Sequence, residues 1–245
     1  MLSKNQIKLI NKLKLKKHRT ESNVFVAEGI KTIKELLESN LKLKHLYTTE
    51  LFNIETDLET LISEADLKRI SFLTTPNKAL AVFEIPKSNP IDLTQMCVAL
   101  DDVRDPGNLG TIIRLCDWFG VRDLICNKGT VDCFNPKVVQ ATMGSITRVN
   151  INYIDLEAFI NDVNVPVYGA FMDGKNVYTH NALLNSGILV MGNEANGVSN
   201  SIEALITEKI AIPRFGALRA TESLNVATAT SILLSEFKRR TLTEK

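Results

Sequence analysis

The sequence predicts an α/β fold in two parts, the second built on a mostly parallel sheet that helices cover. Strand-like apolar runs alternate with helical patterns along residues 91–245, which is typical of parallel strands joined by helical crossovers. Pro86 and Pro90 bracket a short polar segment that cannot extend a neighbouring helix or strand, so it separates the two parts. With 245 residues, the chain is long enough to bury a core without disulfides or a metal.

Residues 1–86 are expected to form a small α/β domain. Val24–Ala27 and Leu43–Thr48 are short apolar runs typical of strands, and apolar residues at helical spacing predict a helix over Ile30–Ser39. The weaker patterns predict a short helix around residues 7–15, a helix over Leu51–Ile62, a strand over Leu67–Ile70 and a short helix over Pro76–Phe83.

Residues 91–245 are expected to form the larger domain. The predicted strands are Met96–Leu100, Leu124–Cys126, Val149–Ile151, Val165–Phe171, Ile188–Met191 and Lys209–Ile212. The predicted helices are Leu109–Phe119, Pro136–Met143, Leu156–Val163, Ser201–Ile206 and Leu224–Arg240. In such a sheet, ligands bind beyond the carboxyl ends of the strands. Three polar, glycine-containing segments follow strands here, and they are therefore the candidate site loops.

The net charge of +1 conceals a strongly basic N-terminus. Residues 1–20 contain seven basic side chains and no acid, whereas the rest of the chain carries 22 basic and 28 acidic ones. This favours contact with a polyanion such as nucleic acid; the alternative is a solvated helix face. The longest apolar stretch, Ile188–Gly192, is far shorter than the ~20 residues of a membrane helix. Residues 1–20 hold no apolar signal-peptide core, so we expect a cytoplasmic protein without membrane contact.

Residue spacing argues against several common sites. The four cysteines contain no C-x-x-C pair and the three histidines are scattered, so we expect reduced thiols and no metal. No two glycines are spaced i, i+2, which disfavours a Rossmann loop and the usual glycine-rich methyltransferase loop. Gly169–Asn176 resembles a P-loop but ends in Asn176 instead of Ser or Thr, so a turn at Asp173 and Gly174 is simpler. His180 has no evident nucleophile and G-x-S-x-G is absent, which disfavours a hydrolase triad.

The first candidate loop covers residues 101–114, after the predicted strand Met96–Leu100. Asp105 begins an Asp-Pro-Gly turn, and Asn108 is a plausible N-cap of the helix that follows. Arg114 is then expected near the first helical turn, at the carboxyl edge of the sheet. The alternative is a capped helix with an ordinary surface arginine.

The second and third candidate loops cover residues 190–199 and 212–226. Glu194 places a carboxylate just after a buried strand, and Asn196 with Gly197 predicts a turn before a helix capped by Ser199 or Asn200. In the third loop, Ser223 is expected to cap the last helix, with Asn225 beside it. Ordinary turns and helix caps are the alternative for both loops.

Taken in order, the three loops read D-P-G-N-x-G-x-I-x-R, G-N-E-x-x-G and E-S-L-N-V-A. This arrangement is similar to that of the SpoU/TrmH family of RNA ribose 2′-O-methyltransferases. The N-terminal part resembles the L30-like substrate-binding domain frequent in that family, through Lys16, Lys17, His18 and Arg19 and through Phe25–Gly29.

The resemblance implies a catalytic domain with a deep trefoil knot and a homodimer. It implies S-adenosylmethionine as methyl donor, bound at Gly192, Ile212 and Leu224, and no metal. The implied catalytic residues are Asn108, Arg114, Glu194, Ser223 and Asn225. Lys14, Lys16, Lys17 and Arg19 would contact RNA phosphates.

The implied chemistry is methyl transfer to a ribose 2′-hydroxyl, which requires RNA. Arg114 would act as a base or stabilise the developing oxyanion; the second role, or a phosphate-assisted one, is favoured because a guanidinium rarely loses its proton. The two-domain layout favours ribosomal over transfer RNA. Alternatives are a non-catalytic RNA-binding or ribosome-assembly protein and a base methyltransferase of related fold. Six residues separate Gly216 from Ser223 where the family usually has about three, which is expected to re-aim Arg219 or lengthen the donor loop.

Overall fold

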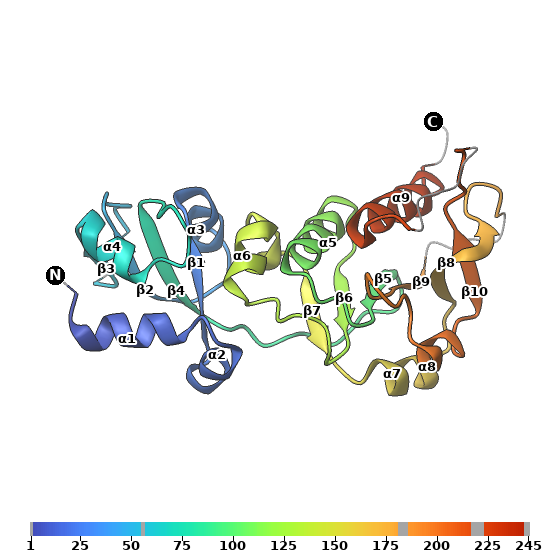
Figure 1. Ribbon diagram of the computed structural model, residues 1–245, viewed down its shortest axis with the longest axis horizontal. Coiled ribbons are helices and arrows are strands. Elements are labelled where there is room, and N and C mark those ends of the chain that lie inside the picture. The colour runs from blue at the N-terminus through green and yellow to red at the C-terminus, as the bar shows by residue number, and fades with distance from the viewer. Residues whose placement is uncertain (1, 55–56, 181–185, 217–222, 243–245) are drawn as a thin grey trace. The chain divides into compact units, whose positions relative to one another are not determined.

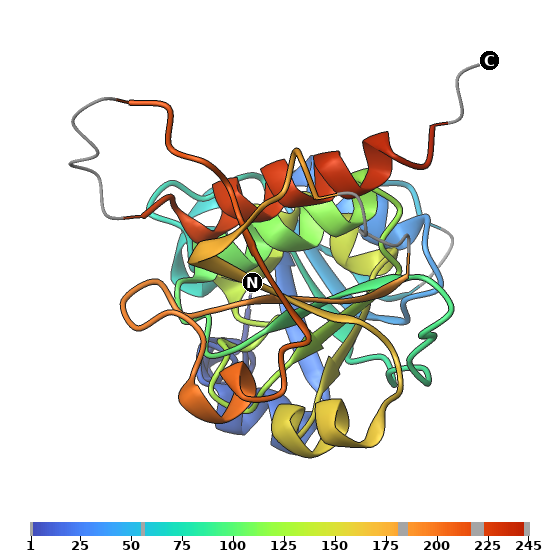
Figure 2. The same cartoon turned by 90° about the vertical axis from the view of Figure 1, so that its right-hand side faces the viewer.

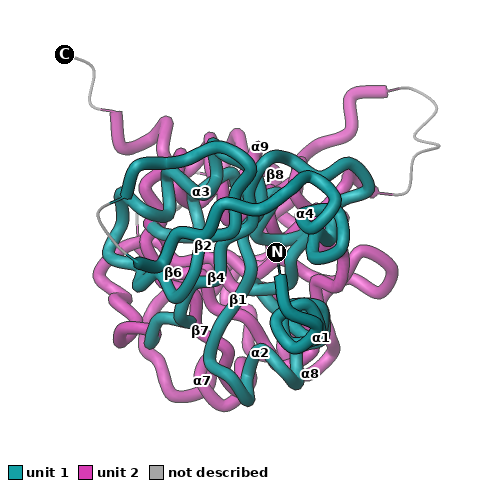
Figure 3. The backbone as a smooth tube through the Cα atoms, turned by 90° about the vertical axis from the view of Figure 1, so that its left-hand side faces the viewer, with its two compact units in different colours: residues 1–87, 132–147 teal, residues 88–131, 148–245 magenta. Residues whose placement is uncertain are grey.

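The computed structural model describes residues 2–54, 57–180, 186–216 and 223–242. The chain forms two compact units, residues 1–87 with 132–147 and residues 88–131 with 148–245 (Figure 3). The first border between them falls inside the segment bracketed by the two prolines. The sequence predicted a single division of the chain near this segment. In the structure, residues 132–147 also pack with the first unit.

The first unit contains a four-stranded sheet in the order β1-β4-β2-β3. Its strands are β1 (Val24–Glu28), β2 (Leu43–Thr48), β3 (Glu59–Leu61) and β4 (Ala79–Glu84). β4 is antiparallel to both neighbours, and β2 and β3 are parallel. The helices are α1 (Lys4–Lys12), α2 (Lys16–Ser22), α3 (Ile30–Leu37), α4 (Glu64–Ile70) and α6 (Pro136–Thr142), followed by the 3₁₀ turn η1 (Ser145–Thr147).

Three element predictions in the first unit were wrong. The helix predicted over Leu51–Ile62 contains the strand β3 instead. The strand predicted over Leu67–Ile70 is the end of α4, which begins where the Ser63 side chain accepts a hydrogen bond from a backbone N–H in the first turn. The helix predicted over Pro76–Phe83 is mostly β4, a central strand with nearly every residue buried. Such a continuous apolar run cannot be distinguished from a buried helix by its periodicity.

The segment 132–147 joins the first unit through buried contacts. Phe134 packs against Phe25 of β1 with ring centroids 4.8 Å apart. The Nε atom of Arg19 donates to Asp132 at 3.0 Å, and α6 lies against β1. The chain therefore leaves the second unit after Val131 and returns to it at Arg148.

The second unit contains a six-stranded sheet in the order β10-β8-β9-β5-β6-β7, and every neighbouring pair is parallel (Figure 1). The strands are β5 (Met96–Leu100), β6 (Asp123–Cys126), β7 (Asn150–Tyr153), β8 (Val167–Asn176), β9 (Gly187–Met191) and β10 (Glu208–Ala211). This confirms the predicted parallel α/β sheet. β5 and β9 are buried along their whole length, as expected for strands covered on both faces.

Helices cover both faces of this sheet. α5 (Pro106–Trp118) and α9 (Val226–Arg239) pack together on one face, and α7 (Leu156–Asp162) and α8 (Asn200–Glu203) lie on the other (Figure 2). The four cysteines of the chain are buried and free of disulfide bonds. Within the described part of the chain, no helix is long and apolar enough to cross a bilayer.

The turn expected at Asp173 and Gly174 does not end a strand, because both residues lie inside β8. β8 pairs with β10 through Tyr168 and Gly169, and the register then shifts before Lys175. Residues 170–174 form the resulting bulge. The bulge matters for function because it contributes to the wall of the cavity described below.

Candidate active site

The three candidate loops follow β5, β9 and β10 of the second unit. Because all six strands are parallel, their carboxyl ends lie along one edge of the sheet. β5 and β9 are direct neighbours, so residues 101–105 and 192–199 emerge side by side. The fold therefore brings the separated sequence motifs to a single edge.

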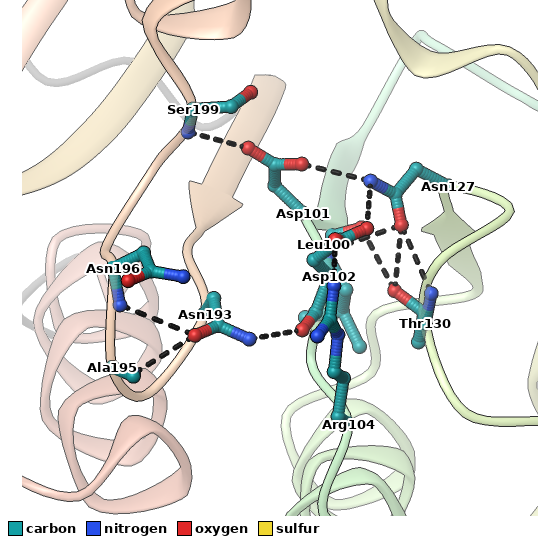
Figure 4. Close-up of polar contacts among 10 residues, drawn as sticks. All are labelled: Leu100, Asp101, Asp102, Arg104, Asn127, Thr130, Asn193, Ala195, Asn196 and Ser199. Atoms are coloured by element: carbon teal, nitrogen blue, oxygen red, sulfur yellow. Dashed lines mark hydrogen bonds and ion pairs between the residues drawn. The ribbon is translucent and has the colours of Figure 1, made fainter.

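A buried carboxylate ties the loops after β5, β6 and β9 together (Figure 4). The side chain of Asp101 is 3% exposed. Its Oδ2 accepts the backbone N–H of Ser199 at 2.7 Å, and its Oδ1 accepts Nδ2 of Asn127 at 2.8 Å. Asn193 adds a second tie, since its Nδ2 donates to the Asp102 carbonyl oxygen at 2.6 Å. Hydrogen bonds from these side chains thus hold the loops together beyond the ends of their strands.

The G-N-E-x-x-G loop is a tight turn that is closed by backbone hydrogen bonds and requires its two glycines. The backbone groups of Asn193 and Gly197 exchange hydrogen bonds of 2.8 and 2.9 Å. Gly197 has a φ of +69°, and a Cβ on Gly192 would lie 2.2 Å from the carbonyl carbon of Gly197. Both glycines are therefore required by the backbone. Glu194, which follows Asn193 in this loop, has an exposed side chain.

Asn108 joins the first and second loops to the start of α9. Its Nδ2 donates to Oε1 of Glu194 at 2.9 Å, and its Oδ1 accepts Nδ2 of Asn225 at 2.8 Å. Glu194 as a carboxylate can only accept, so Asn108 must turn its NH₂ toward it and its oxygen toward Asn225. Asn225 then uses its own Oδ1 to accept the backbone N–H groups of Ala227 and Thr228.

Two helix caps differ from the prediction. α5 is capped by Asp105, whose side chain accepts the backbone N–H of Asn108, so Asn108 lies within the first turn and its amide is available for the network. α9 is capped by Asn225 and not by Ser223. α8 begins after Ser199, one of its two expected caps, although no side-chain hydrogen bond forms there.

A cavity of about 1020 Å³ opens between these loops and α9. Its wall includes six of the residues predicted from the motifs, namely Gly192, Glu194, Ile212, Ser223, Leu224 and Asn225. The bulge of β8 adds Phe171 and Met172. Two large apolar residues of the wall are exposed to solvent, Phe215 by 86% and Leu224 by 48%. Arg219, in the longer segment before Ser223, lies outside the described residues.

Arg114 does not join the network in its own chain. α5 begins at Pro106, so Arg114 lies in the third helical turn. The prediction that it lies near the first turn was wrong. Arg114 follows Asn108 by six residues, which is about 9 Å along the helix and about 240° around it. Its side chain is exposed, is not part of the cavity wall, and has no hydrogen-bond or ion-pair partner within the described residues.

The basic residues of the first unit have two different environments. Lys14, Lys16 and Lys17 are exposed, in agreement with a role at a surface. Arg19 is 2% exposed, and its NH1 donates to the carbonyl oxygens of Leu13 and Lys14 at 2.8 Å each, while Asp132 binds its other nitrogens. Arg19 thus uses four of its five N–H donors inside the unit, and its predicted phosphate contact stays a prediction.

Sequence reasoning did not single out Asp101, Asn127 or Asn193, which organise the site. Asp101 and Asn127 each follow directly on a buried strand, and that position was the available signal. Among the described residues, no group of three His, Cys, Asp or Glu side chains could hold a metal ion.

An all-parallel sheet with a cavity at its carboxyl edge, formed by loops without a glycine-rich phosphate motif, defines an α/β ligand-binding domain outside the Rossmann group. Residues 95–235 match the SpoU rRNA Methylase family, and residues 4–81 match the MRM3-like substrate binding domain. The chain belongs to the SpoU rRNA Methylase family, which confirms the resemblance drawn from the motifs.

Relatives cover nearly the whole chain. The 23S rRNA (guanosine(2553)-2′-O)-methyltransferase RlmP of Bacillus subtilis is 31% identical over 95% of this chain and 96% of its own. An AdoMet-bound rRNA methyltransferase from Sinorhizobium meliloti is 32% identical, covering 99% of this chain and 97% of that one, with a TM-score of 0.88. A protein assigned to the TrmH family from Porphyromonas gingivalis is 40% identical over 98% and 99% of the two chains, also with a TM-score of 0.88.

Proposed function

We propose that this protein transfers a methyl group from S-adenosylmethionine to a ribose 2′-hydroxyl of ribosomal RNA. The observation that carries the proposal is the cavity at the sheet edge, whose wall includes residues of the second and third family motifs, with Asn108 of the first bonded to two of them. RlmP, which aligns with nearly the whole chain, is named for this reaction on 23S rRNA, and the relative from Sinorhizobium meliloti binds AdoMet. These similarities favour ribosomal RNA over transfer RNA, and we keep the cytoplasm as the proposed compartment.

The cavity suits S-adenosylmethionine in size and chemistry. Its volume of about 1020 Å³ is at the upper end of small-molecule sites. Backbone groups of the loops after β9 and β10 supply polar partners, with Gly192 and Ile212 in the wall. Phe215 and Leu224 present apolar surface that a bound adenine would cover. When bound, the donor supplies an activated methyl group.

The hydrogen-bonded side chains of Asn108, Glu194 and Asn225 would hold the ribose and the guanidinium that stabilises its 2′ oxygen. The 2′-hydroxyl must give up its proton, to water or to an RNA phosphate, as its oxygen attacks the methyl group, so negative charge develops on that oxygen. A guanidinium keeps its proton and can stabilise this charge, which is the role we assign to Arg114. Glu194 uses one oxygen for Asn108, and its other oxygen could orient the guanidinium. Ser223 and Asn225 would position the hydroxyl and the donor at the cavity mouth.

We propose that Arg114 reaches this site from a second copy of the chain, in a homodimer. In its own chain it lies outside the cavity wall and has no polar partner among the described residues. Trp118, one helical turn further along α5, is 83% exposed. Arg114 and Trp118 share one helix face, and such an exposed aromatic favours a covered interface.

Two structural expectations remain part of the proposal. The first is the trefoil knot, supported by a chain that passes from β9 to β10 beyond β8 and then returns so that α9 packs on α5. The second is the L30-like character of the first unit, supported by its match to a substrate-binding domain. A non-catalytic RNA-binding protein of the same fold is less favoured, because all five predicted catalytic residue types are present.

The test is incubation of the protein with labelled S-adenosylmethionine and unmodified ribosomal or transfer RNA, followed by nucleoside analysis. The proposal predicts a 2′-O-methylnucleoside in ribosomal RNA. Label on a base would contradict the reaction, and label confined to transfer RNA would contradict the substrate. Donor binding without transfer to either RNA, including partly assembled ribosomal particles, would favour the non-catalytic alternative.

A further inference from the structure

The first unit has a cavity of its own, separate from the motif loops. It has a volume of about 450 Å³ and opens between α1, α2 and the sheet. α1 contributes apolar residues and a lysine, and β2 contributes Lys44, His45 and Tyr47. Every residue of its wall belongs to the first unit, so the cavity is a feature of that unit alone.

The helices that form this cavity are held firmly. Ser3 and Gln6 form a capping box at the start of α1, with hydrogen bonds of 2.9 and 3.2 Å. Ile10 and Leu13 are buried in the core of the unit. Arg19 fixes the turn between α1 and α2, because its buried guanidinium binds the carbonyl oxygens of Leu13 and Lys14. The opening is therefore preorganised by the same arginine that was expected to bind RNA directly.

Part of the cavity wall is apolar and aromatic. Leu9 is 64% exposed there, beside the buried Ile10 and Val82. The rings of His45 and Tyr47 lie with centroids 4.4 Å apart. Burial lowers the pKa of His45, which favours a neutral ring at neutral pH. Tyr47 is buried in the core of the unit, so the exposed Leu9 and the half-buried ring of His45 form the surface that is suited to a flat ligand.

The rim of the cavity is cationic. Lys12 and Lys44 are in the wall and exposed, and Lys44 also pairs with Glu84 at 3.1 Å. Among the described residues, Glu21 is the single acid in the wall, and it already pairs with His18 at 3.0 Å and Lys17 at 3.9 Å. The preceding 20 residues carry seven basic groups and no acid. The ligand that complements this charge is an anion.

We propose that this cavity binds one unpaired nucleotide of the RNA substrate, with the base on the apolar and aromatic wall and phosphates near Lys12 and Lys44. The inference rests on the proposed function, since it adds a second contact to the same RNA. Proteins read single-stranded RNA by stacking splayed bases on aromatic side chains, whereas an RNA duplex keeps its bases inside. The cavity therefore gives the unit a preference for a loop or bulge over a continuous helix.

Two matched pairs of variants test the proposal in the full-length protein. Leu9 and Leu15 are 64% and 61% exposed, but only Leu9 is in the cavity wall, so Leu9→Asp and Leu15→Asp add the same charge in different places. Lys42 and Lys44 both pair with Glu84 from exposed positions, but only Lys44 is in the wall. The measurement is fluorescence anisotropy with a labelled single-stranded RNA decamer and with its fully paired duplex.

We expect Leu9→Asp to weaken binding of the single strand about tenfold or more relative to Leu15→Asp. Lys44→Ala should weaken it a few-fold relative to Lys42→Ala, and the duplex should show neither difference. Equal losses within each pair would overturn the proposal, as would competition by polyglutamate as effective as that by RNA, which would indicate an acidic peptide.

Methyl transfer by the same proteins separates this inference from the proposed function. If the wild type transfers methyl groups and Leu9→Asp binds RNA as tightly as Leu15→Asp, the cavity proposal alone fails. If the wild type transfers none but binds single-stranded RNA through the cavity, the proposed reaction fails and the binding site stands.

Discussion

Asn108 donates a 2.9 Å hydrogen bond from Nδ2 to Oε1 of Glu194, although 86 residues separate the two in the chain. The same amide accepts a hydrogen bond from Asn225, so the three motifs of the family meet in one line of side chains. The direction of every bond in this line is determined, because it begins at a carboxylate that only accepts and ends at helix N–H groups that only donate.

The first prediction concerns the direction of these bonds. Asn225→Asp keeps a good helix cap but removes the NH₂ group whose hydrogen bond Asn108 accepts. If Asn108 flips to donate to the new carboxylate, its oxygen faces Glu194. We expect kcat/KM for methyl transfer to fall about 10- to 100-fold, with the unfolding free energy changed by less than about 1 kcal/mol.

Asn196→Asp is the matched control, because Asn196 is exposed in the same edge region and is not in the cavity wall. Steady-state kinetics and urea unfolding measure the two quantities. A loss of activity that merely follows a loss of stability, or an equal loss in the control, would contradict the role of the network.

The second prediction concerns the buried carboxylate of Asp101. Asp101→Asn places an NH₂ group against either the Ser199 N–H or the Asn127 amide, both of which are donors. Asn127 cannot flip to compensate, because its oxygen already accepts the backbone N–H groups of Asp102 and Thr130. We expect urea titration to show a loss of about 1–3 kcal/mol in the unfolding free energy. We also expect weaker binding of S-adenosylmethionine.

Asp105→Asn provides the control for this experiment. Asp105 is an exposed N-cap, and asparagine caps helices about as well as aspartate. The control should lose less than about 0.5 kcal/mol. Comparable losses at both positions would mean that the Asp101 hydrogen bonds do not hold the loops.

The third prediction separates the exposed lysines from Arg19. Lys16→Glu with Lys17→Glu should weaken RNA binding and reduce the slope of log K against log salt by about 0.7–0.9 for each phosphate that the protein no longer neutralises. Arg19→Lys should instead lower the unfolding free energy, because it breaks buried hydrogen bonds to Leu13 and Lys14. An unchanged salt slope in the double variant would contradict the binding of phosphates by these lysines.

The fourth prediction concerns the stability of α9 at low pH. Glu236 accepts hydrogen bonds from Arg239 and Arg240, and these arginines lower its pKa to about 2. A carboxylate with a lowered pKa stabilises the fold above its unfolded value of about 4.5, and the stabilisation is lost as the pH falls toward 2. Glu236→Gln should therefore cost about 1–2 kcal/mol at pH 7 and little at pH 2, measured by urea unfolding across this range. A cost independent of pH would contradict the assignment.

The parallel sheet could be predicted because its strands are short apolar runs between turn signals, as in β5 and β9. β4 was misassigned because a fully buried strand shows no alternation. The α5 cap could have been recognised, since Asp105 before Pro106 is the usual order of an N-cap and a first helical proline. The choice between Ser223 and Asn225 could not, because both residue types cap helices well.

Six of the residues predicted from the motifs line the cavity, but spacing alone could not show that Arg114 lies outside its wall. The six-residue spacing gives the angle between Arg114 and Asn108 only once both are known to lie within α5, and Asn108 was expected to be the cap. The spacing within one chain also carries no information about a second copy. Arg19 shows the complementary limit. A basic residue in a basic segment was expected at the surface, and only the contacts with Asp132, Leu13 and Lys14 reveal that it is internal.

In the proposed homodimer, Asn108, Glu194 and Asn225 of one copy form the methyl-transfer site together with Arg114 of the other. The most direct measurement is label transfer to ribosomal RNA by Arg114→Ala, by Glu194→Gln, and by the two variants after joint unfolding and refolding. Each variant alone should lose about 10²–10³-fold in rate. The mixture should recover about a quarter of wild-type activity, because half of the dimers are mixed and each has one intact site out of two. A mixture as inactive as its components would contradict the shared site, and full activity of either variant alone would contradict the assigned residues.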